Sequence, residues 1–409
     1  MINALRGMKD LLDDDGKLYK FIIEICESVA KNYGYEFCET PKMEETGLFK
    51  RSVGESSDIA QKEMYQFIDK GGNDVCLRPE GTAGVVRAFL EAKFDKAGGV
   101  KKYFYHGSMF RYERPQRGRL REFHQFGVEC FGESSVYEDV SIILMVGEIL
   151  NKLGIKATLK LNSLGDSDCM PKYRQKLIKF IEANKNELCE DCNRRLETNP
   201  IRILDCKKEH CQMLLKNAPL ITENLNEECE KDFSNLKEIL IQNKIKFEVD
   251  PKLVRGLDYY CKTAFEFVSD EIGSQSAVAG GGRYDKLTEF LGGKPTPAIG
   301  FAMGCERIME ILKQKEFAPK RDGIYICALD EKYIKQIYSL GFNLRKKHKV
   351  EISYEAKSLN KHLNLADKKL AKIFLCIGED EAKNGEIWYK NLENKDEKRL
   401  SLDDLKEVL

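Results

Sequence analysis

Four side chains that could bind a charged ligand lie along a predicted β-hairpin. The hairpin strands, 102–113 and 120–131, flank a polar turn rich in arginine. Side chains two or four positions apart share one face of a strand, so two polar pairs are expected to face the same way. These pairs are Arg111 with Glu113 and Gln125 with Glu129. Buried charges need partners, and the pattern therefore indicates either a ligand-binding face or a solvated outer face.

Four further segments favour the ligand-binding interpretation because they combine arginine, tyrosine and glycine. They are Arg78–Thr82, Arg255–Tyr260, Gly280–Asp285 and Gly304–Arg307. The planar guanidinium of arginine can bind phosphate oxygens in pairs, and glycine lets a backbone approach a ligand closely. None of the segments is a Walker loop or a dinucleotide fingerprint. The segments therefore indicate recognition of phosphate by arginine side chains.

The composition is typical of a soluble protein with two or three domains. Of the 409 residues, 42% are hydrophobic and 33% are charged, and 67 basic side chains balance 67 acidic ones. A net charge of zero neither supports nor excludes a nucleic-acid partner, because local patches steer phosphate. The start lacks the apolar run of a secretory signal, and no stretch approaches the roughly 20 apolar residues of a membrane span. We therefore expect a cytoplasmic protein with no membrane partner and with reduced cysteines.

The elements that position the polar segments fall into two regions that meet near Pro319. Before Pro319, the hydrophobic spacing predicts two helices and two strands besides the hairpin. They are helices at 15–31 and at about 301–313, and strands at 246–249 and 262–268. The stretch 166–228 is rich in charge, asparagine and cysteine and is mostly helical in pattern, so we interpret it as an insertion. After Pro319, a βαβαββ order predicts a separate α/β domain of about 90 residues.

Taken together and in order, these motifs resemble those of histidyl-tRNA synthetases, which belong to class II. The resemblance extends over essentially the whole chain. The matching segments are an opening segment (Leu5–Asp10), the motif 1 proline (Pro41), motif 2 (Phe110–Glu113 and Phe123–Gln125), motif 3 (Gly300–Arg307) and two signatures of the histidine enzymes (Leu253–Tyr260 and Gly280–Asp285). Either signature alone is highly specific.

The resemblance implies an α+β catalytic domain at 1–318, built on a six-stranded antiparallel sheet with one further parallel strand and flanking helices. The helical insertion 166–228 belongs to this domain, and residues 320–409 would form an α/β anticodon-binding domain. The family also implies a homodimer whose two-fold interface includes motif 1.

The activity that the resemblance implies has two steps. L-Histidine reacts with ATP to give histidyl-adenylate and pyrophosphate, and the histidine is then transferred to the 3′ end of tRNA(His). The histidine carboxylate is itself the nucleophile, so the first step needs charge neutralisation and positioning more than a protein base. By resemblance, Arg111 and Arg255 are the catalytic residues and hold the α-phosphate and the carboxylate. The residues expected to bind ATP, with Mg²⁺ assisting, are Arg111, Glu113, Arg119, Phe123 and Arg307.

Histidine itself would be recognised by hydrogen-bond acceptors for its ammonium group and by one acceptor and one donor for the two nitrogens of its imidazole. Glu80, Thr82 and Gln125 correspond to the family's ammonium positions. Glu129 would accept the imidazole N–H, Tyr260 would donate to the other nitrogen, and Tyr284 would line the pocket. The residues of the motif 2 loop expected to meet the tRNA acceptor end are Gln116 and Arg117. We expect the neighbouring His124 to be a structural residue.

Cysteines in the insertion raise the question of a metal. Cys189 and Cys192 are followed by Cys206 and Cys211, and four thiolates could hold zinc in a structural site, with His210 as a substitute ligand. The second pair has a loose spacing for a zinc ribbon, and segment 199–207 resembles a family segment that requires no metal. We therefore expect plain thiols and keep zinc as the alternative.

Three rival functions remain open at this point. The strongest is a non-catalytic, histidine-binding regulatory paralogue of histidine biosynthesis that partners a phosphoribosyltransferase. Such paralogues tend to lose the ATP-binding residues and the C-terminal domain, whereas this chain has Arg111, Glu113, Arg255 and Arg307 and the extra domain. An RNA-binding protein would leave the arginines and tyrosines unexplained. A class II synthetase for another amino acid would not account for the two histidine signatures.

Overall fold

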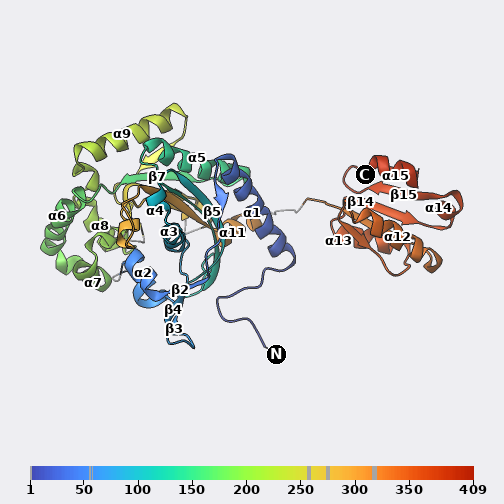
Figure 1. Cartoon of the computed structure of the whole chain (residues 1–409), viewed down its shortest axis with the longest axis horizontal. Coiled ribbons are helices and arrows are strands. Elements are labelled where there is room, and N and C mark those ends of the chain that lie inside the picture. Colours follow the sequence, from blue (N-terminus) through green and yellow to red (C-terminus); the bar gives the residue numbers. More distant parts are fainter. Residues whose placement is uncertain (1, 55–56, 58, 256–258, 273–276, 316–319) are drawn as a thin grey trace. The chain divides into compact units, whose positions relative to one another are not determined.

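Separate hydrophobic cores divide the chain into two units, residues 1–317 and 318–409 (Figure 1). The computed structural model describes residues 2–54, 57, 59–255, 259–272, 277–315 and 320–409. Pro319, expected to mark the linker, and residues 256–258 of the first histidine signature lie outside the described residues. None of the helices in the described ranges is long and apolar enough to cross a membrane.

An eight-stranded sheet forms the framework of the first unit. Its strand order is β1-β5-β6-β11-β10-β9-β7-β8. The bounds are β1 Glu36–Phe37, β5 Lys101–Phe110, β6 Glu122–Phe131, β11 Ala298–Gly304, β10 Ala277–Arg283, β9 Cys261–Val268, β7 Thr158–Ser163 and β8 Phe247–Val249. Among the six strands from β5 to β7, each strand is antiparallel to the next in the sheet, as predicted.

The expectation of a single further parallel strand was wrong, because a parallel strand lies at each edge of the sheet. β1 pairs with β5, and β8 pairs with β7. Parallel neighbours need a crossover connection. The chain between β7 and β8 contains the whole insertion and helix α9 (Glu227–Gln242), and it supplies that crossover.

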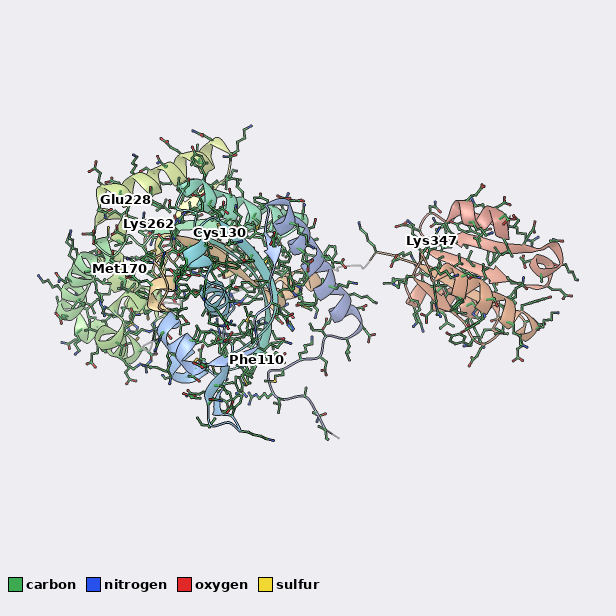
Figure 2. All side chains as sticks on the ribbon, viewed as in Figure 1. Phe110, Cys130, Met170, Glu228, Lys262 and Lys347 are labelled. Atoms are coloured by element: carbon green, nitrogen blue, oxygen red, sulfur yellow. The ribbon has the colours of Figure 1, made fainter. Side chains whose placement is uncertain are left out.

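One face of the sheet is covered by helices. These are α1 (Asp13–Asn32), α5 (Val136–Lys152), α9 and α11 (Cys305–Gln314). α1 begins with three aspartates, which favour a helix N-terminus, and buries Leu18, Ile22, Cys26 and Val29 on one side. These side chains pack with Phe126 and other residues of the sheet. The Lys262 ammonium of β9 pairs with Glu228 of α9 at 2.8 Å (Figure 2).

The predicted helix at about 301–313 was wrong at its start. Residues 301–304 belong to strand β11, and α11 begins only at Cys305. β11 pairs on both sides, with β6 and with β10. These ladders extend the strand to Gly304, and the backbone turns into a helix only beyond them.

Smaller elements cover the other face of the sheet. Helix α3 (Thr82–Glu91) lies there, and a three-stranded sheet of order β2-β4-β3 precedes it in the chain. The remaining bounds are β2 Met43–Glu45, β3 Gln66–Ile68, β4 Asp74–Leu77, α2 Thr46–Val53, α4 Phe94–Ala97, α10 Leu287–Phe290, a π-helical turn Ile59–Glu63 and a 3₁₀ turn Asp270–Ile272. Val85 and Phe89 of α3 pack with Tyr105, Tyr259 and Tyr284, so this face holds the tyrosines.

The insertion is helical, as predicted, and has its own hydrophobic core. Its elements are α6 Cys169–Ala183, α7 Glu190–Thr198, α8 Glu209–Leu214 and 3₁₀ turns at Lys185–Glu187, Pro200–Asp205, Leu215–Asn217 and Ile221–Glu223. Three of its cysteines are fully buried in that core.

The second unit is a five-stranded sheet of order β13-β12-β14-β15-β16 with helices. Its bounds are β12 Ile324–Ala328, α12 Ile334–Leu344, β13 Val350–Ile352, α13 Leu359–Lys368, β14 Ile373–Ile377, α14 Glu379–Asn384, β15 Glu386–Asn391, β16 Glu397–Ser401, α15 Leu402–Val408 and a 3₁₀ turn Glu331–Tyr333. The predicted βαβαββ order is confirmed through β15. The predicted order omitted α14, β16 and α15, which are short and carry few buried residues.

Candidate active site

A buried carboxylate lies at the centre of the tyrosine-rich face. Glu129 is 1% exposed. Its Oε1 accepts hydrogen bonds from Thr82 Oγ1 at 2.7 Å and from Tyr105 Oη at 3.1 Å, and its Oε2 accepts one from Tyr284 Oη. Burial raises the pKa of Glu129 to about 8, although the hydroxyl donors favour the ionised form and act in the opposite direction.

The hydrogen bonds of Glu129 leave room for one more donor. A carboxylate offers about four acceptor positions, and hydroxyls occupy three of them. One further N–H can therefore be accepted at Oε2 without displacing a protein group.

A second buried carboxylate, Glu80, lies at the N-terminus of α3. Its two oxygens accept the backbone N–H groups of Thr82 at 2.6 Å and Ala83 at 3.0 Å, which closes the first turn of the helix. Burial raises the pKa of Glu80, while these backbone donors lower it. Each carboxylate oxygen has a second acceptor position, so Glu80 can cap the helix and bind a cationic group at the same time.

Arg255 is held between strands on the same face. One of its Nη atoms pairs with Glu266 of β9, and its guanidinium lies 5.5 Å from the centre of the Tyr260 ring. Gly280 of β10 makes this position accessible, because a Cβ built there would lie 2.5 Å from the guanidinium. Gly280 therefore leaves space for the arginine, and the three glycines 280–282 lie in strand β10 rather than in a loop.

Three buried polar atoms around this pocket lack a hydrogen-bond partner among the described residues. They are Gln125 Oε1, Arg255 Nε and Tyr259 Oη. Buried polar atoms in folded proteins are nearly always bonded. The three atoms are a hydrogen-bond acceptor, a cationic donor and a hydroxyl. A polar ligand that has both donors and acceptors could bond to all three.

Arginines gather beside the pocket, at the end of the hairpin. Glu113 forms an ion pair with Arg119, and Arg111 Nη1 lies 3.9 Å from the same carboxylate. The Arg111 guanidinium also lies 5.2 Å from the centre of the Phe123 ring. Burial lowers the pKa of Arg307, and the positive charges of Arg119 and Arg111 lower it further. Cations that repel one another in this way stabilise a bound anion.

The prediction that Arg111 and Glu113 extend a strand was wrong. β5 ends at Phe110, which Figure 2 labels, and both residues follow in the loop. The hairpin ladder opens here because the Arg121 N–H bonds to the carbonyl of Gly7 in the opening segment instead of to the facing strand. The side chains of Arg111 and Glu113 still lie at one site, because they contact each other and Glu113 also pairs with Arg119.

His124 is bonded to protein groups, which supports the expectation that it is a structural residue. Its ring Nδ1 lies 2.8 Å from Glu306 Oε1, its backbone N–H also bonds to Glu306, and its ring packs on Tyr19 at 4.8 Å. These contacts tie β6 to the first turn of α11 and so help to position the next residue, Arg307.

The two residues expected to meet tRNA lie in the turn of the hairpin. Gln116 pairs with Arg119 across the turn. Arg117 is 62% exposed in its side chain and pairs with Glu310 at 2.9 Å. Both are outside the buried pocket and can be reached from solvent.

Three residues of the site were not predicted from the sequence. Tyr105 and Glu266 each oppose a glycine across the sheet, in the pairs Tyr105–Gly127 and Glu266–Gly280. The Tyr105 ring fills the space that Gly127 leaves, whereas the Arg255 guanidinium, paired with Glu266, fills the space at Gly280. The first pairing could have been found from the hairpin register. The second could not, because it joins strands whose register depends on the fold. Tyr259 stood in the histidine signature but was assigned no role.

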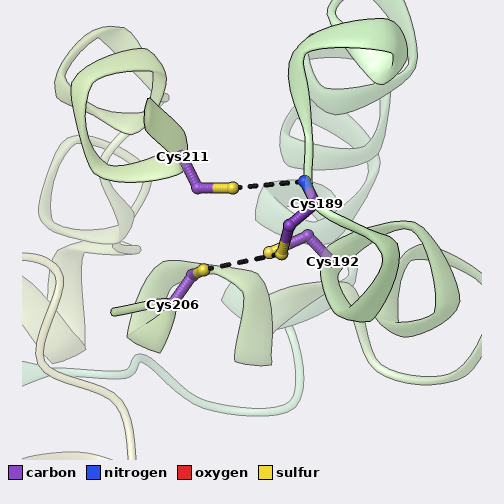
Figure 3. Close-up of side chains that lie close together, drawn as sticks. All are labelled: Cys189, Cys192, Cys206 and Cys211. Carbon is purple, nitrogen blue, oxygen red and sulfur yellow. Dashed lines mark hydrogen bonds between the residues drawn. The ribbon is translucent and has the colours of Figure 1, made fainter. Parts of the chain in front are cut away.

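The four cysteines of the insertion lie outside this pocket. The structure brings them together in one cluster (Figure 3), whereas the exposed His210 does not belong to it.

Comparisons with known proteins agree along the whole chain. A family model described as histidyl-tRNA synthetase matches residues 7–308, and one described as anticodon binding domain matches residues 323–409. A histidine–tRNA ligase of Campylobacter fetus is 81% identical over 402 residues, covering 98% of each chain. A histidine–tRNA ligase of Campylobacter hominis is 71% identical and covers 100% of both chains.

Solved structures show the same fold. A histidyl-tRNA synthetase of S. aureus in its apo form superposes with a TM-score of 0.81 at 34% identity, over 100% of this chain and 99% of that one. A Bacillus halodurans protein, described as an ATP phosphoribosyltransferase regulatory subunit/histidyl-tRNA synthetase, has a TM-score of 0.65 at 19% identity, over 92% and 98%. The second likeness concerns the fold alone.

Proposed function

The chain belongs to the histidyl-tRNA synthetase family, and on that premise we propose that it activates L-histidine with ATP and transfers it to tRNA(His). The observation that carries the proposal is that Glu129, a carboxylate with one open acceptor position, lies beside a cluster of arginines. This site occurs in a chain that matches histidine–tRNA ligases over its full length. The regulatory paralogue is not favoured, because the relatives with 63–81% identity are ligases.

For activation, we propose that Arg111 and Arg255 hold the α-phosphate and the reacting carboxylate. Their guanidinium groups neutralise the charge that develops as the carboxylate attacks and pyrophosphate leaves. Arg119 and Arg307 bind the outer phosphates, and their mutual repulsion with Arg111 supports this assignment. Phe123 stacks on adenine, and Glu113 accepts from its amino group.

ATP enters as its Mg²⁺ complex, so the ion is part of the substrate. Mg²⁺ prefers phosphate oxygens and one or two carboxylates. Near the arginine cluster, Glu113 provides a buried carboxylate that is already paired with Arg119. The arginines therefore supply most of the protein's own charge compensation.

For histidine, we propose that the open position of Glu129 accepts the imidazole N–H and that Tyr260 donates to the other ring nitrogen, with Tyr284 orienting Glu129. The unpartnered Gln125 Oε1, with Glu80 and Thr82, accepts from the α-ammonium. An amino acid with an apolar side chain would leave Glu129 unsatisfied, which is how such pockets discriminate by about 10⁴-fold or more.

For tRNA, we propose that Gln116 and Arg117 meet the acceptor end and that the second unit reads the anticodon. α12 supports this assignment because exposed aromatic and basic side chains lie along it and just beyond its end. They are Tyr338, Phe342, Arg345, Lys346 and Lys347; Lys347 is labelled in Figure 2. Aromatic rings stack on unpaired bases, and basic groups pair with phosphates.

We further propose a cytoplasmic homodimer. The motif 1 region around Pro41 exposes Phe37 and Met43, which are 50% and 46% accessible in a single chain. Apolar side chains exposed together are typical of an interface. Sedimentation equilibrium at micromolar concentration tests the dimer, and a single species of 46.9 kDa would reject it.

Pyrophosphate exchange with each of the twenty amino acids, together with aminoacylation of tRNA(His), tests the function. We expect exchange with histidine alone and charging of tRNA(His). A regulatory paralogue would bind histidine without exchange. In a chain ending at residue 317, exchange should persist while charging weakens, provided that the truncated chain is still a dimer.

A further inference from the structure

Four cysteines from three segments of the insertion converge in space (Figure 3). Cys189 precedes α7, Cys192 lies in its first turn, Cys206 ends the 3₁₀ turn Pro200–Asp205, and Cys211 lies in α8. All four sulfur atoms lie within 4.8 Å of one another, and Cys189 Sγ is 3.9 Å from Cys206 Sγ.

The 3.9 Å separation of Cys189 Sγ and Cys206 Sγ matches that of two ligands in a tetrahedral metal site. Zinc binds thiolates at about 2.3 Å, so two ligands of a tetrahedron lie roughly 3.8 Å apart. A disulfide would bring two sulfurs to about 2.05 Å, whereas all four of these cysteines are free. Packing of a hydrophobic core does not by itself require four sulfur atoms to lie within 4.8 Å of one another.

The surroundings donate a hydrogen bond to one sulfur atom and shield most of the cluster from water. The backbone N–H of Cys189 points at Cys211 Sγ, 3.3 Å away (Figure 3). Cys192, Cys206 and Cys211 are 0–5% exposed, and the buried side chains around them are apolar, including Leu188, Ile203 and Leu215. A hydrogen bond to sulfur within a largely apolar shell is typical of a structural metal site.

The insertion also has only a small hydrophobic core of its own. It spans about 60 residues, and a core of this size supplies only limited stability, to which a bound metal can add. Its hydrophobic cluster contains only twelve buried residues, three of which are these cysteines.

We propose that Cys189, Cys192, Cys206 and Cys211 bind one structural Zn²⁺. Each thiol loses its proton on binding, so the ion is held by four thiolates and no position is left for water or substrate. The expectation of plain thiols relied on a segment, 199–207, that resembles one requiring no metal. It did not include the convergence of the four sulfur atoms, because that follows from the fold of three separate segments.

A neighbouring cluster offers a matched control. Asp166, Cys169 and Cys229 also lie close together, but Asp166 already accepts the backbone N–H of Cys169 at 3.0 Å and the Asn226 side chain at 2.8 Å. These bonds close the start of α6, so the cluster has a structural explanation without a metal.

The test is the metal content of the full-length protein, purified with a reductant and without added chelator. Elemental analysis should find one zinc per chain in the wild type and in Cys169→Ser, and less than a tenth of that in Cys206→Ser and Cys211→Ser. Cobalt exchanged into the wild type should show the visible absorption of tetrahedral thiolate coordination. Cys206→His, which retains a zinc ligand, should retain the ion and remains informative if the serine variants do not fold.

Three results would overturn the proposal. The first is a wild-type chain without zinc whose four cysteines all react as free thiols or contain a disulfide. The second is zinc that survives both serine substitutions. The third is zinc that is lost from Cys169→Ser and kept by Cys206→Ser, which would place the ion in the neighbouring cluster.

Discussion

The candidate active-site pocket and the insertion each bury a cluster of reactive side chains, and the two clusters satisfy those side chains in different ways. In the pocket, Gln125, Arg255 and Tyr259 each retain a buried atom without a partner among the described residues. In the insertion, the four sulfur atoms converge on one another within 4.8 Å. The pocket is thus arranged for a ligand that enters and leaves, and the insertion for an ion that stays.

The elements that position the two clusters differ in the same way. Gln125 and Glu129 come from the central strand β6, Glu266 from β9, Thr82 from α3 and Arg307 from α11, and Arg255 and Tyr259 precede β9. The strands among these elements are secured by the ladders of the large sheet. The cysteines come from short helices and 3₁₀ turns around a small core. A rigid framework can hold unsatisfied polar groups in place, whereas short elements need the ligand itself to hold them.

The largest expected effect is the loss of Arg255 from the pocket. Arg255→Ala should reduce the rate of histidine activation about 10²–10³-fold, because a donor aimed at charge developing in the transition state is removed. Histidine binding should change much less. Single-turnover adenylate formation measures the first quantity and equilibrium dialysis the second.

Arg174→Ala, on the exposed side of α6, is the control and should behave like the wild type. Arg255→Lys should recover only part of the rate, since an ammonium lacks the paired donors of a guanidinium. Near-normal adenylate formation in Arg255→Ala would remove Arg255 from the catalytic residues.

A smaller effect is expected when the buried carboxylate is made neutral. In Glu129→Gln, the amide keeps the size of the side chain but loses the charge that accepts the imidazole N–H. A hydrogen bond to a charged group contributes about 1.5–3 kcal/mol, so KM for histidine should rise roughly 10- to 100-fold with a smaller change in kcat. KM for ATP should stay the same.

Glu248→Gln, on the exposed edge strand β8, is the matched control for this substitution. If KM for ATP rose as much as KM for histidine, the change would have disturbed the pocket as a whole, and the specific role of Glu129 would be lost.

The two clusters also show what a sequence can and cannot predict. Gln125 and Glu129 could be placed on one face from the alternation of β6, and the order of elements in the second unit followed from hydrophobic spacing. Glu266 could not be found, since its contact with Arg255 depends on the register of β9 against β10. The parallel pairing of β8 and the convergence of the four cysteines likewise depend on segments that meet only after folding.

Loss of zinc from the insertion should affect stability more than chemistry. Cys206→Ser should lower the midpoint of thermal unfolding by several degrees, because a small core loses its metal. Pyrophosphate exchange at low temperature should stay within about twofold of the wild type, since the pocket is built from other elements. A loss of exchange comparable to that of Arg255→Ala, in a folded protein, would show that the two clusters are not independent.

The smallest effect concerns the cost of burying Glu129, and it appears as a dependence of stability on pH. In the ligand-free folded chain, Glu129 keeps its proton up to its pKa of about 8, while an unfolded glutamate releases its proton near the ordinary value of 4.5. Because the unfolded chain gives up the proton first, this group makes the folded state progressively less stable as pH rises from about 4.5 to about 8. Glu129→Gln has no proton to lose at this position, so it should gain stability relative to the wild type across that range.

Thermal unfolding midpoints of both proteins, measured without histidine at several pH values from 5 to 8, should therefore diverge with increasing pH. The tyrosine hydroxyls that donate to Glu129 are common to both proteins and do not titrate in this range, since burial raises the pKa values of Tyr105 and Tyr284. A difference between the two midpoints that stayed constant with pH would mean that Glu129 is already ionised in the folded chain. Burial of this hydrogen-bond acceptor for histidine would then not reduce the stability of the folded state.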